Sequence, residues 1–199
     1  MSPRPPDADS LAHLLKEVRV PANGLLRLSR FPATEPFWSQ GRYRFDGPPA
    51  EQPGSFGTCY AAADIAVAFA ESVIHESAWF RHGCYEVPLA VLRSRHIVQL
   101  HRPARPELLL ADFTGAALKR LGLNNDISAG DDYTAPMAWA KAIHEADPKW
   151  DGILYVSRQH NDGHAVALFK RSNIAKARSR KLTGKALDRL CDQFGVLAI

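Results

Sequence analysis

The sequence predicts a single α+β domain, in which a mixed and mostly antiparallel sheet carries inserted helices. Short apolar strand-like segments recur along the chain, and helical segments interrupt them without a regular strand–helix alternation. The chain also has 199 residues, 46% of them hydrophobic, which is enough for one sizeable core. There is no internal repeat and no low-complexity tract that would favour a different architecture.

The helices are predicted from apolar residues at helical spacing. We expect Asp9 or Ser10 to cap a short first helix. Its apolar face would be Leu11, Leu14, Leu15 and Val18. Asp64 lies near the start of the next helix, where a negative charge suits the helix dipole. The other predicted helices are Ala62–Trp79, Phe113–Leu121, Thr134–Ala146 and Ala186–Phe194, with a polar loop at Asn124–Asp132.

The strands are predicted from apolar residues bounded by turn residues. One segment, Gly152–Ser157, is so rich in apolar residues that we place it in the centre of the sheet. A turn at His160–Gly163 leads from it into the next strand. The predicted strands are Leu25–Ser29, Thr58–Ala61, Cys84–Leu89, His96–Leu100, Gly152–Ser157 and His164–Phe169.

A long irregular segment, Phe31–Gly57, holds five prolines and four glycines. Loops of this length inside a compact domain are usually functional or disordered. Aromatic residues recur within this one, which argues against disorder. They are Phe37, Trp38, Tyr43 and Phe45. We therefore expect an ordered binding loop.

Composition excludes some classes of protein. No apolar run approaches the roughly 20 residues of a membrane span, and the N-terminus lacks the apolar core of a signal peptide. We expect a soluble cytoplasmic protein. The three cysteines, Cys59, Cys84 and Cys191, have no metal-ligand spacing and are expected to be reduced thiols.

The net charge of +4 arises mainly from Lys170–Lys185, which contains no acidic residue. A solvated surface is the simplest interpretation of this segment, and a contact with nucleic acid or with an antitoxin protein is the alternative.

Two catalytic readings are rejected. His160 and His164 are four residues apart, but they flank a turn rather than one helical face, so we expect no metal site. Ser157 lies near His160 and Asp162, but the Gly-x-Ser-x-Gly elbow of a serine hydrolase is absent.

The segment from Gly41 to Glu76 brings together groups that suit a charged nucleotide. It contains two arginines that can grip a phosphate, an aromatic ring at Tyr60 and a carboxylate at Glu71. Helical periodicity places Glu71 at the border of the apolar arc, beside Asp64 and His75. On that basis alone Glu71 would be an ordinary surface carboxylate.

Four sequence blocks together resemble the RES domain family, which is named for its Arg, Glu and Ser. They are Arg27 in Leu-Leu-Arg-Leu-Ser, Arg44 in Arg-Phe-Asp, Glu71 in Ala-Phe-Ala-Glu, and Ser157 in Trp-Asp-Gly-Ile-Leu-Tyr-Val-Ser. The resemblance predicts a RES domain at residues 25–171. Residues 1–24 would form an N-terminal extension with a short helix, and residues 172–199 a basic segment whose final helix packs on the domain.

The resemblance implies a fold like that of ADP-ribosyltransferases and an enzyme that cleaves NAD⁺, its substrate rather than a cofactor. Members are commonly toxins paired with an Xre-type helix-turn-helix antitoxin. A homodimer or a toxin–antitoxin hetero-oligomer is then expected, with DNA contacted only through the antitoxin. Water or phosphate would accept the ADP-ribose, and modification of a protein target is the alternative.

Cleavage of the nicotinamide–ribose bond expels a leaving group that is already cationic, so no general acid is needed. The ribosyl centre gains positive charge in the transition state, and we assign its stabilisation to Glu71. Arg27 and Arg44 are the candidates for clamping the pyrophosphate, since a guanidinium offers paired donors. Arg42 is either a helper or a solvated charge.

Two further residues complete the predicted site. Tyr60 can stack on nicotinamide or bond a ribose hydroxyl, or can simply be a core aromatic residue. Ser157 can orient the ribose or the amide, or can simply end its strand. Competing hypotheses are a basic nucleic-acid-binding or ribonuclease-like toxin and a non-catalytic nucleotide-binding module.

Overall fold

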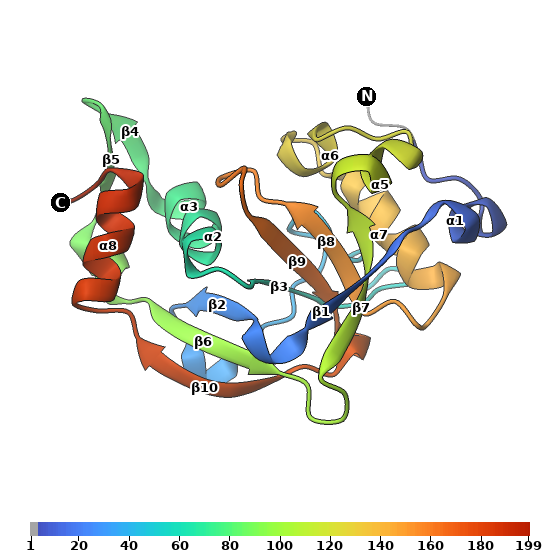
Figure 1. Cartoon of the computed structure of the whole chain (residues 1–199), viewed down its shortest axis with the longest axis horizontal. Coiled ribbons are helices and arrows are strands. Elements are labelled where there is room, and N and C mark those ends of the chain that lie inside the picture. Colours follow the sequence, from blue (N-terminus) through green and yellow to red (C-terminus); the bar gives the residue numbers. More distant parts are fainter. Residues whose placement is uncertain (1–3) are drawn as a thin grey trace.

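The computed structural model describes residues 4–199, which form one α+β domain around an eight-stranded mixed sheet. The strand order is β1-β7-β8-β9-β3-β2-β6-β10, and every neighbouring pair is antiparallel except β7 and β8 (Figure 1). A second sheet of three strands has the order β11-β5-β4. The mixed, mostly antiparallel α+β class predicted from the sequence is confirmed.

The strands of the large sheet are β1 (Glu17–Pro21), β2 (Leu26–Ser29), β3 (Thr58–Ala62), β6 (His96–His101), β7 (Glu107–Phe113), β8 (Gly152–Val156), β9 (His164–Phe169) and β10 (Ala175–Lys181). Those of the small sheet are β4 (Trp79–Arg81), β5 (Cys84–Val87) and β11 (Val196–Ala198). The strand at 152–156 lies between β7 and β9, which confirms its predicted interior position.

The α-helices are α1 (Ala8–Leu14), α2 (Ile65–Phe69), α3 (His75–Ser77), α4 (Leu89–Arg93), α5 (Gly115–Arg120), α6 (Asp126–Ala129), α7 (Thr134–Ala146) and α8 (Lys185–Phe194). A π-helical segment, η3 (Ala70–Ile74), joins α2 to α3. Short 3₁₀ turns are η1 (Ala22–Gly24), η2 (Pro32–Thr34) and η4 (Lys170–Ser172).

The large sheet is almost interrupted between β2 and β3. Only one residue pair, Leu26 and Ala62, is in register between these strands. Beyond that pair β2 continues alongside β6, whereas all five residues of β3 pair with β9. Figure 1 shows β2, β6 and β10 as a lower group of strands, with β7, β8 and β9 standing beside them.

The main core lies on the face of the sheet that carries the helices. Its largest fully buried side chains include Phe45, Phe69, Phe113 and Trp139, drawn from a loop, α2, β7 and α7. A smaller apolar cluster on the other face includes Leu25, Val98 and Leu108. Burial on both faces explains why the central strands are almost continuously apolar.

Several predicted elements differ from the structure. The first helix is capped by Asp7, whose side chain accepts from Ser10 N, and not by Asp9 or Ser10. Val18 belongs to β1 rather than to the face of that helix. The predicted polar loop at 124–132 contains the short helix α6, and the helix expected from residue 113 begins at Gly115 because β7 occupies the preceding residues.

The sequence analysis also left some strands unassigned. Edge strand β1 carries charged residues between its apolar ones, and β10 is almost wholly exposed, so neither has the pattern of a buried strand. The basic segment predicted to be solvated is thus partly the exposed edge strand β10, which pairs with β6. Lysine and arginine on such an edge oppose pairing with other chains.

Candidate active site

Glu71 and Ser157 meet in the structure although 86 residues separate them. The Ser157 hydroxyl donates to Glu71 Oε1 at 2.6 Å. Ser157 follows the last residue of β8 and is fully buried. Its Oγ accepts from His160 N at 3.1 Å and its backbone N–H donates to Gly163 O, so both its main chain and its hydroxyl are fixed.

Glu71 lies in the π-helical segment η3. A π-turn closes i→i+5 hydrogen bonds, is wider than an α-turn and occurs often at functional sites. The helical wheel behind the sequence prediction assumed uniform α geometry, and it gave a surface carboxylate. The structure corrects this, because Glu71 is partly buried and contacts Ser157.

Gly163 permits the close approach of these two elements. It ends the turn between β8 and β9, and a Cβ at this position would lie 2.2 Å from Val67 Cγ2. Val67 is on α2, one turn before Glu71. Any larger residue would therefore push the turn that holds Ser157 away from the helix that leads to Glu71.

The side chain of Arg27, on β2, bonds to β3 and to the loop after β2. Its Nε donates to Glu35 Oε1 at 3.0 Å and its Nη1 to the Tyr60 carbonyl at 2.9 Å. The Glu35 side chain is only 2% exposed, so this ion pair is largely screened from water. These two bonds leave Nη2 of the five-donor guanidinium available for a ligand.

Arg44 is buried and is held by the segment that precedes α7. Its Nη1 donates to the Gly130 carbonyl at 2.6 Å, and its guanidinium lies 4.8 Å from the centroid of the Tyr133 ring. Arg42, two residues earlier, is exposed, and its guanidinium lies over the ring of Tyr43 at 5.0 Å. The structure thus gives Arg44 a fixed position and leaves Arg42 at the surface.

Tyr60 and Asp46 order the loop that carries Arg44. The Tyr60 hydroxyl donates to Asp46 Oδ1 at 3.0 Å and accepts from Phe45 N at 2.8 Å. Asp46 is fully buried and also accepts from the backbone N–H groups of Arg42 and Tyr43. Burial raises the pKa of the Asp46 carboxyl, and these hydrogen bonds act in the opposite direction. The Tyr60 hydroxyl is therefore occupied within the protein.

Tyr155 is a further candidate site residue, which was not predicted from the sequence. It lies on β8, two residues before Ser157, which directly follows the strand. Side chains two residues apart in an extended chain project to the same side. Its ring packs against Phe45 at 4.9 Å between centroids, and the residue is 5% exposed. None of the hydrogen bonds described for residues 4–199 uses its hydroxyl.

Tyr155 lies within the electrostatic influence of three of the predicted site residues. Burial raises the pKa of its hydroxyl well above the usual value, and the charge of Glu71 raises it further. The positive charges of Arg44 and Arg27 act in the opposite direction. One buried hydroxyl thus experiences the carboxylate and both arginines of the predicted site. The signal that could have identified Tyr155 was its two-residue spacing from Ser157.

Polar contacts across the turn after Ser157 connect it to neighbouring elements. Arg158 Nη1 pairs with Asp131 Oδ1 at 2.6 Å, and this contact lowers the pKa of the exposed Asp131 carboxyl. Gln159 Nε2 lies 3.0 Å from His75 Nδ1 on α3. These contacts link the turn to the loop before α7 and to the helix after Glu71.

Neither a metal cluster nor a membrane span is found in the part of the chain that the structure describes. Residues 4–199 contain no group of three or more His, Cys, Asp or Glu side chains placed to hold a metal ion. No helix within that range is both long and apolar enough to cross a bilayer.

The family model for the RES domain matches residues 17–187. It covers most of the chain, and the protein belongs to the RES domain family. A search of curated proteins found no match. The matched region begins at β1 and extends past β10, so it includes both edge strands of the large sheet and is wider than the 25–171 segment predicted from the sequence.

Proposed function

We propose that this protein cleaves the nicotinamide–ribose bond of NAD⁺ and transfers ADP-ribose to water or phosphate. The observation that carries the proposal is the 2.6 Å hydrogen bond from Ser157 to Glu71. The proposal is supported by Tyr155, two residues before Ser157, whose hydroxyl is influenced by the charges of Glu71, Arg27 and Arg44. Membership of the RES domain family supports it. Modification of a protein target remains the alternative for the acceptor.

Glu71 has the features that the reaction requires of its carboxylate. As nicotinamide departs, positive charge develops on the ribosyl centre, and a negative group fixed beside it lowers the barrier. The Ser157 hydroxyl occupies Oε1 of Glu71, so Oε2 is available to a ribose hydroxyl or to the nascent cation. Because its backbone is also held, Ser157 fixes the carboxylate before substrate arrives.

The two arginines supply the opposite charge. Arg27 and Arg44 are each anchored by one or two hydrogen bonds, and each retains free N–H donors. The diphosphate of NAD⁺ carries two negative charges, which guanidinium groups bind with paired donors. In the proposal they hold the dinucleotide so that its ribose lies next to Glu71.

The proposal is tested by incubating purified protein with NAD⁺, with and without phosphate, and following the products by mass spectrometry. We expect release of nicotinamide together with ADP-ribose, or with phosphorylated ADP-ribose when phosphate is the acceptor. A mass increase of added protein would instead identify protein transfer. Binding of NAD⁺ without cleavage would identify the protein as a non-catalytic nucleotide-binding module. Cleavage of RNA with NAD⁺ unchanged would favour the ribonuclease-like alternative.

The Glu71→Gln variant isolates the carboxylate. It keeps the size and hydrogen-bonding capacity of the side chain but removes the charge, so we expect an unchanged fold and a loss of NAD⁺ turnover of at least about 100-fold, or roughly 3 kcal/mol. Glu145→Gln, at an exposed position on α7, is the matched control. Near wild-type turnover of Glu71→Gln would remove Glu71 from this role.

A further inference from the structure

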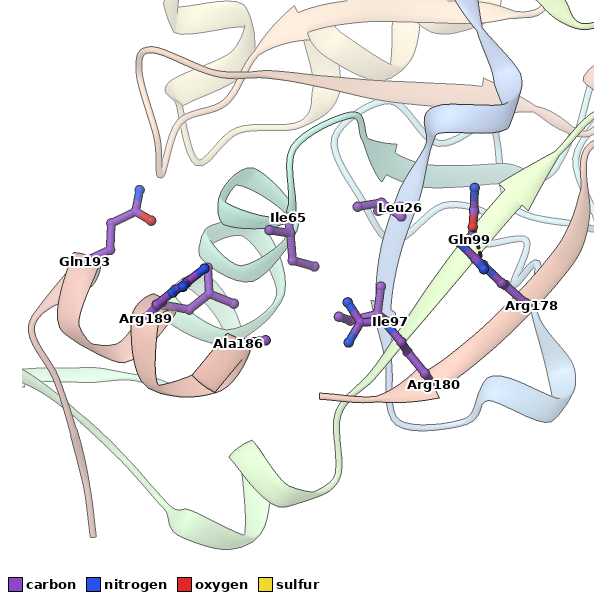
Figure 2. A pocket seen from close by; sticks show the side chains of 10 residues that line it. Leu26, Ile65, Ile97, Gln99, Arg178, Arg180, Ala186, Arg189 and Gln193 are labelled. Carbon is purple, nitrogen blue, oxygen red and sulfur yellow. Dashed lines mark hydrogen bonds between the residues drawn. The ribbon is translucent and has the colours of Figure 1, made fainter. Parts of the chain in front are cut away.

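A groove of about 390 Å³, whose lining includes neither Glu71 nor Ser157, lies between the lower strands of the large sheet and two helices (Figure 2). The strands are β2, β6 and β10, and the helices are α2 and α8. Five apolar side chains line it, namely Leu26, Ile65, Ile97, Ala186 and Leu190. Five polar ones complete it, namely Gln99, Arg178, Arg180, Arg189 and Gln193.

The groove carries uncompensated positive charge. No carboxylate is among its lining residues, and none of its three arginines makes an ion pair within the described residues 4–199. Arg178 donates to the amide oxygen of Gln99 at 2.6 Å, which fixes its side chain without neutralising it. All three arginines are exposed and therefore accessible to a ligand.

The three charges are spread along the groove. Figure 2 shows Arg178 near one end and Arg189 near the other, with the side chain of Arg180 reaching between them over Ile97. Apolar side chains separate the charged groups. This arrangement along the groove suits an elongated ligand.

One wall of the groove lies outside the family match. Arg189, Leu190 and Gln193 are on α8, beyond residue 187, where the RES domain match ends. Helix α8 is held against the domain by ring contacts of Phe194 with Phe69 and His160. This chain's own C-terminal helix thus converts one face of the sheet into a groove.

We propose that the groove is a docking site for an acidic amphipathic segment of a partner protein. Apolar side chains of that segment would cover Leu26, Ile65 and Ala186, which are only partly buried, and its carboxylates would pair with the arginines, in the manner of a helix in a groove. Nucleic acid fits less well, because no aromatic side chain is present for base stacking and a phosphate backbone does not use an apolar floor. The inference does not depend on NAD⁺ cleavage.

The test is fluorescence anisotropy with a labelled peptide of roughly 16 residues, long enough to form a helix, with leucine on one face and glutamate on its flanks. We expect saturable binding to the full-length protein. Arg180→Glu combined with Arg189→Glu should weaken it by at least tenfold, because charge on two walls of the groove is reversed. Thermal unfolding of the variant checks that its fold is intact.

The control reverses two charges elsewhere. Lys119→Glu with Arg120→Glu, at exposed positions at the end of α5, makes the same change of net charge outside the groove and should bind the peptide as the wild type does. If both double variants weaken peptide binding equally, binding depends on net charge and not on the groove, and the proposal is overturned.

Three further ligands separate the alternatives. A peptide with serine in place of leucine should bind at least tenfold more weakly, and unchanged binding would show that the apolar floor has no role. Inorganic phosphate at millimolar concentration should not displace the leucine peptide. A single-stranded RNA that binds more tightly than the peptide, with the same dependence on Arg180 and Arg189, would identify nucleic acid as the occupant instead.

Discussion

At the scale of single residues, the site is built from side chains that other parts of the protein already hold. Arg27 is fixed by Glu35, Arg44 by the Gly130 carbonyl, and Ser157 by the turn that follows it. Such anchoring restricts rotamers before a ligand binds, which lowers the entropic cost of binding. Substitutions that preserve charge but alter geometry should therefore be costly.

Arg44→Lys is expected to raise the Kd for NAD⁺ about tenfold, or roughly 1.4 kcal/mol. Lysine keeps the charge but loses the paired donors and the planar contact with Tyr133. Calorimetry in the Glu71→Gln background measures the affinity without turnover. Arg42→Lys, at the exposed position two residues earlier, should bind as the parent does. Equal affinities of the two variants would contradict the assignment of Arg44.

Tyr155→Phe is expected to lower kcat/KM for NAD⁺ about tenfold while leaving the melting temperature close to that of the wild type. The ring keeps its packing against Phe45, and only a hydroxyl without a partner among residues 4–199 is removed. A hydrogen bond to bound substrate is worth roughly 0.5–1.5 kcal/mol. Tyr85→Phe on β5 serves as the control. Unchanged kinetics of Tyr155→Phe would mean that the hydroxyl does not contact substrate.

At the scale of elements, the π-helical segment is the part that needs external support. Arg95 provides it, because its Nη2 donates to the Ser72 carbonyl at 2.8 Å and lies 3.8 Å from Glu76 Oε2. Arg95 is 3% exposed, and burial lowers the pKa of its guanidinium. Its Nε is buried without a hydrogen-bond partner among the described residues. A buried cation with an unsatisfied donor is costly, which suggests that the contact to η3 is needed.

Arg95→Met is expected to lower kcat for NAD⁺ cleavage more than it raises KM, since the carboxylate would shift while the arginine clamp stays in place. Arg95→Lys should recover part of the loss, because an ammonium can reach the same carbonyl. Arg93→Met, at an exposed position on α4, is the control. A purely structural role predicts reduced stability with unchanged kcat of the folded fraction, and that result would refute the positioning role.

At the scale of the whole molecule, the candidate site draws residues from β2, from the end of β8 and from the long loop at 31–57. Phe45 and Phe56 anchor that loop in the core. The Phe56 ring stacks on His144 of α7 at 3.9 Å with an interplanar angle of 7°, and the His144 carbonyl accepts from Arg171. The contact joins the loop, α7 and the end of β9 into one unit.

This contact predicts how stability depends on pH. Burial, together with the nearby charge of Arg171, lowers the pKa of His144 from 6.5 to about 4. The folded state therefore disfavours protonation, and the unfolded state binds more protons between these values. Stability contributed by the neutral ring should be lost as pH falls from about 6.5 towards 4, by an amount on the order of 2 kcal/mol.

Urea unfolding of the wild type and of His144→Phe at pH 7, 5.5 and 4 measures this contribution. Titration of the carboxylates affects both proteins alike, so it cancels in the difference between their free energies of unfolding. As pH falls, we expect the wild type to lose more stability than the variant. His13→Gln, exposed on α1, should show no such shift. Parallel pH profiles of wild type and His144→Phe would exclude His144 as the titrating group.

Much of the local structure could be predicted from the sequence because it depends on periodicity. The helix at 134–146 and the strands around 152 and 164 have strong apolar patterns, and they occur where predicted. The edge strands β1 and β10 could not be recognised in this way. An edge strand is held by hydrogen bonds to a neighbour distant in sequence, and its own side chains need not be apolar.

The candidate site, too, was predictable only in part from the sequence. Residue type and sequence resemblance were enough to name Arg27, Arg44, Glu71 and Ser157, because guanidinium, carboxylate and hydroxyl groups have distinct chemistry wherever they occur. The contact between Glu71 and Ser157, and the influence of Glu71 on Tyr155, depended on tertiary structure. Three features bring these segments together: the π-helical segment that carries Glu71, the close approach of Gly163 to Val67, and the single residue pair between β2 and β3. All three arise only when the whole chain packs.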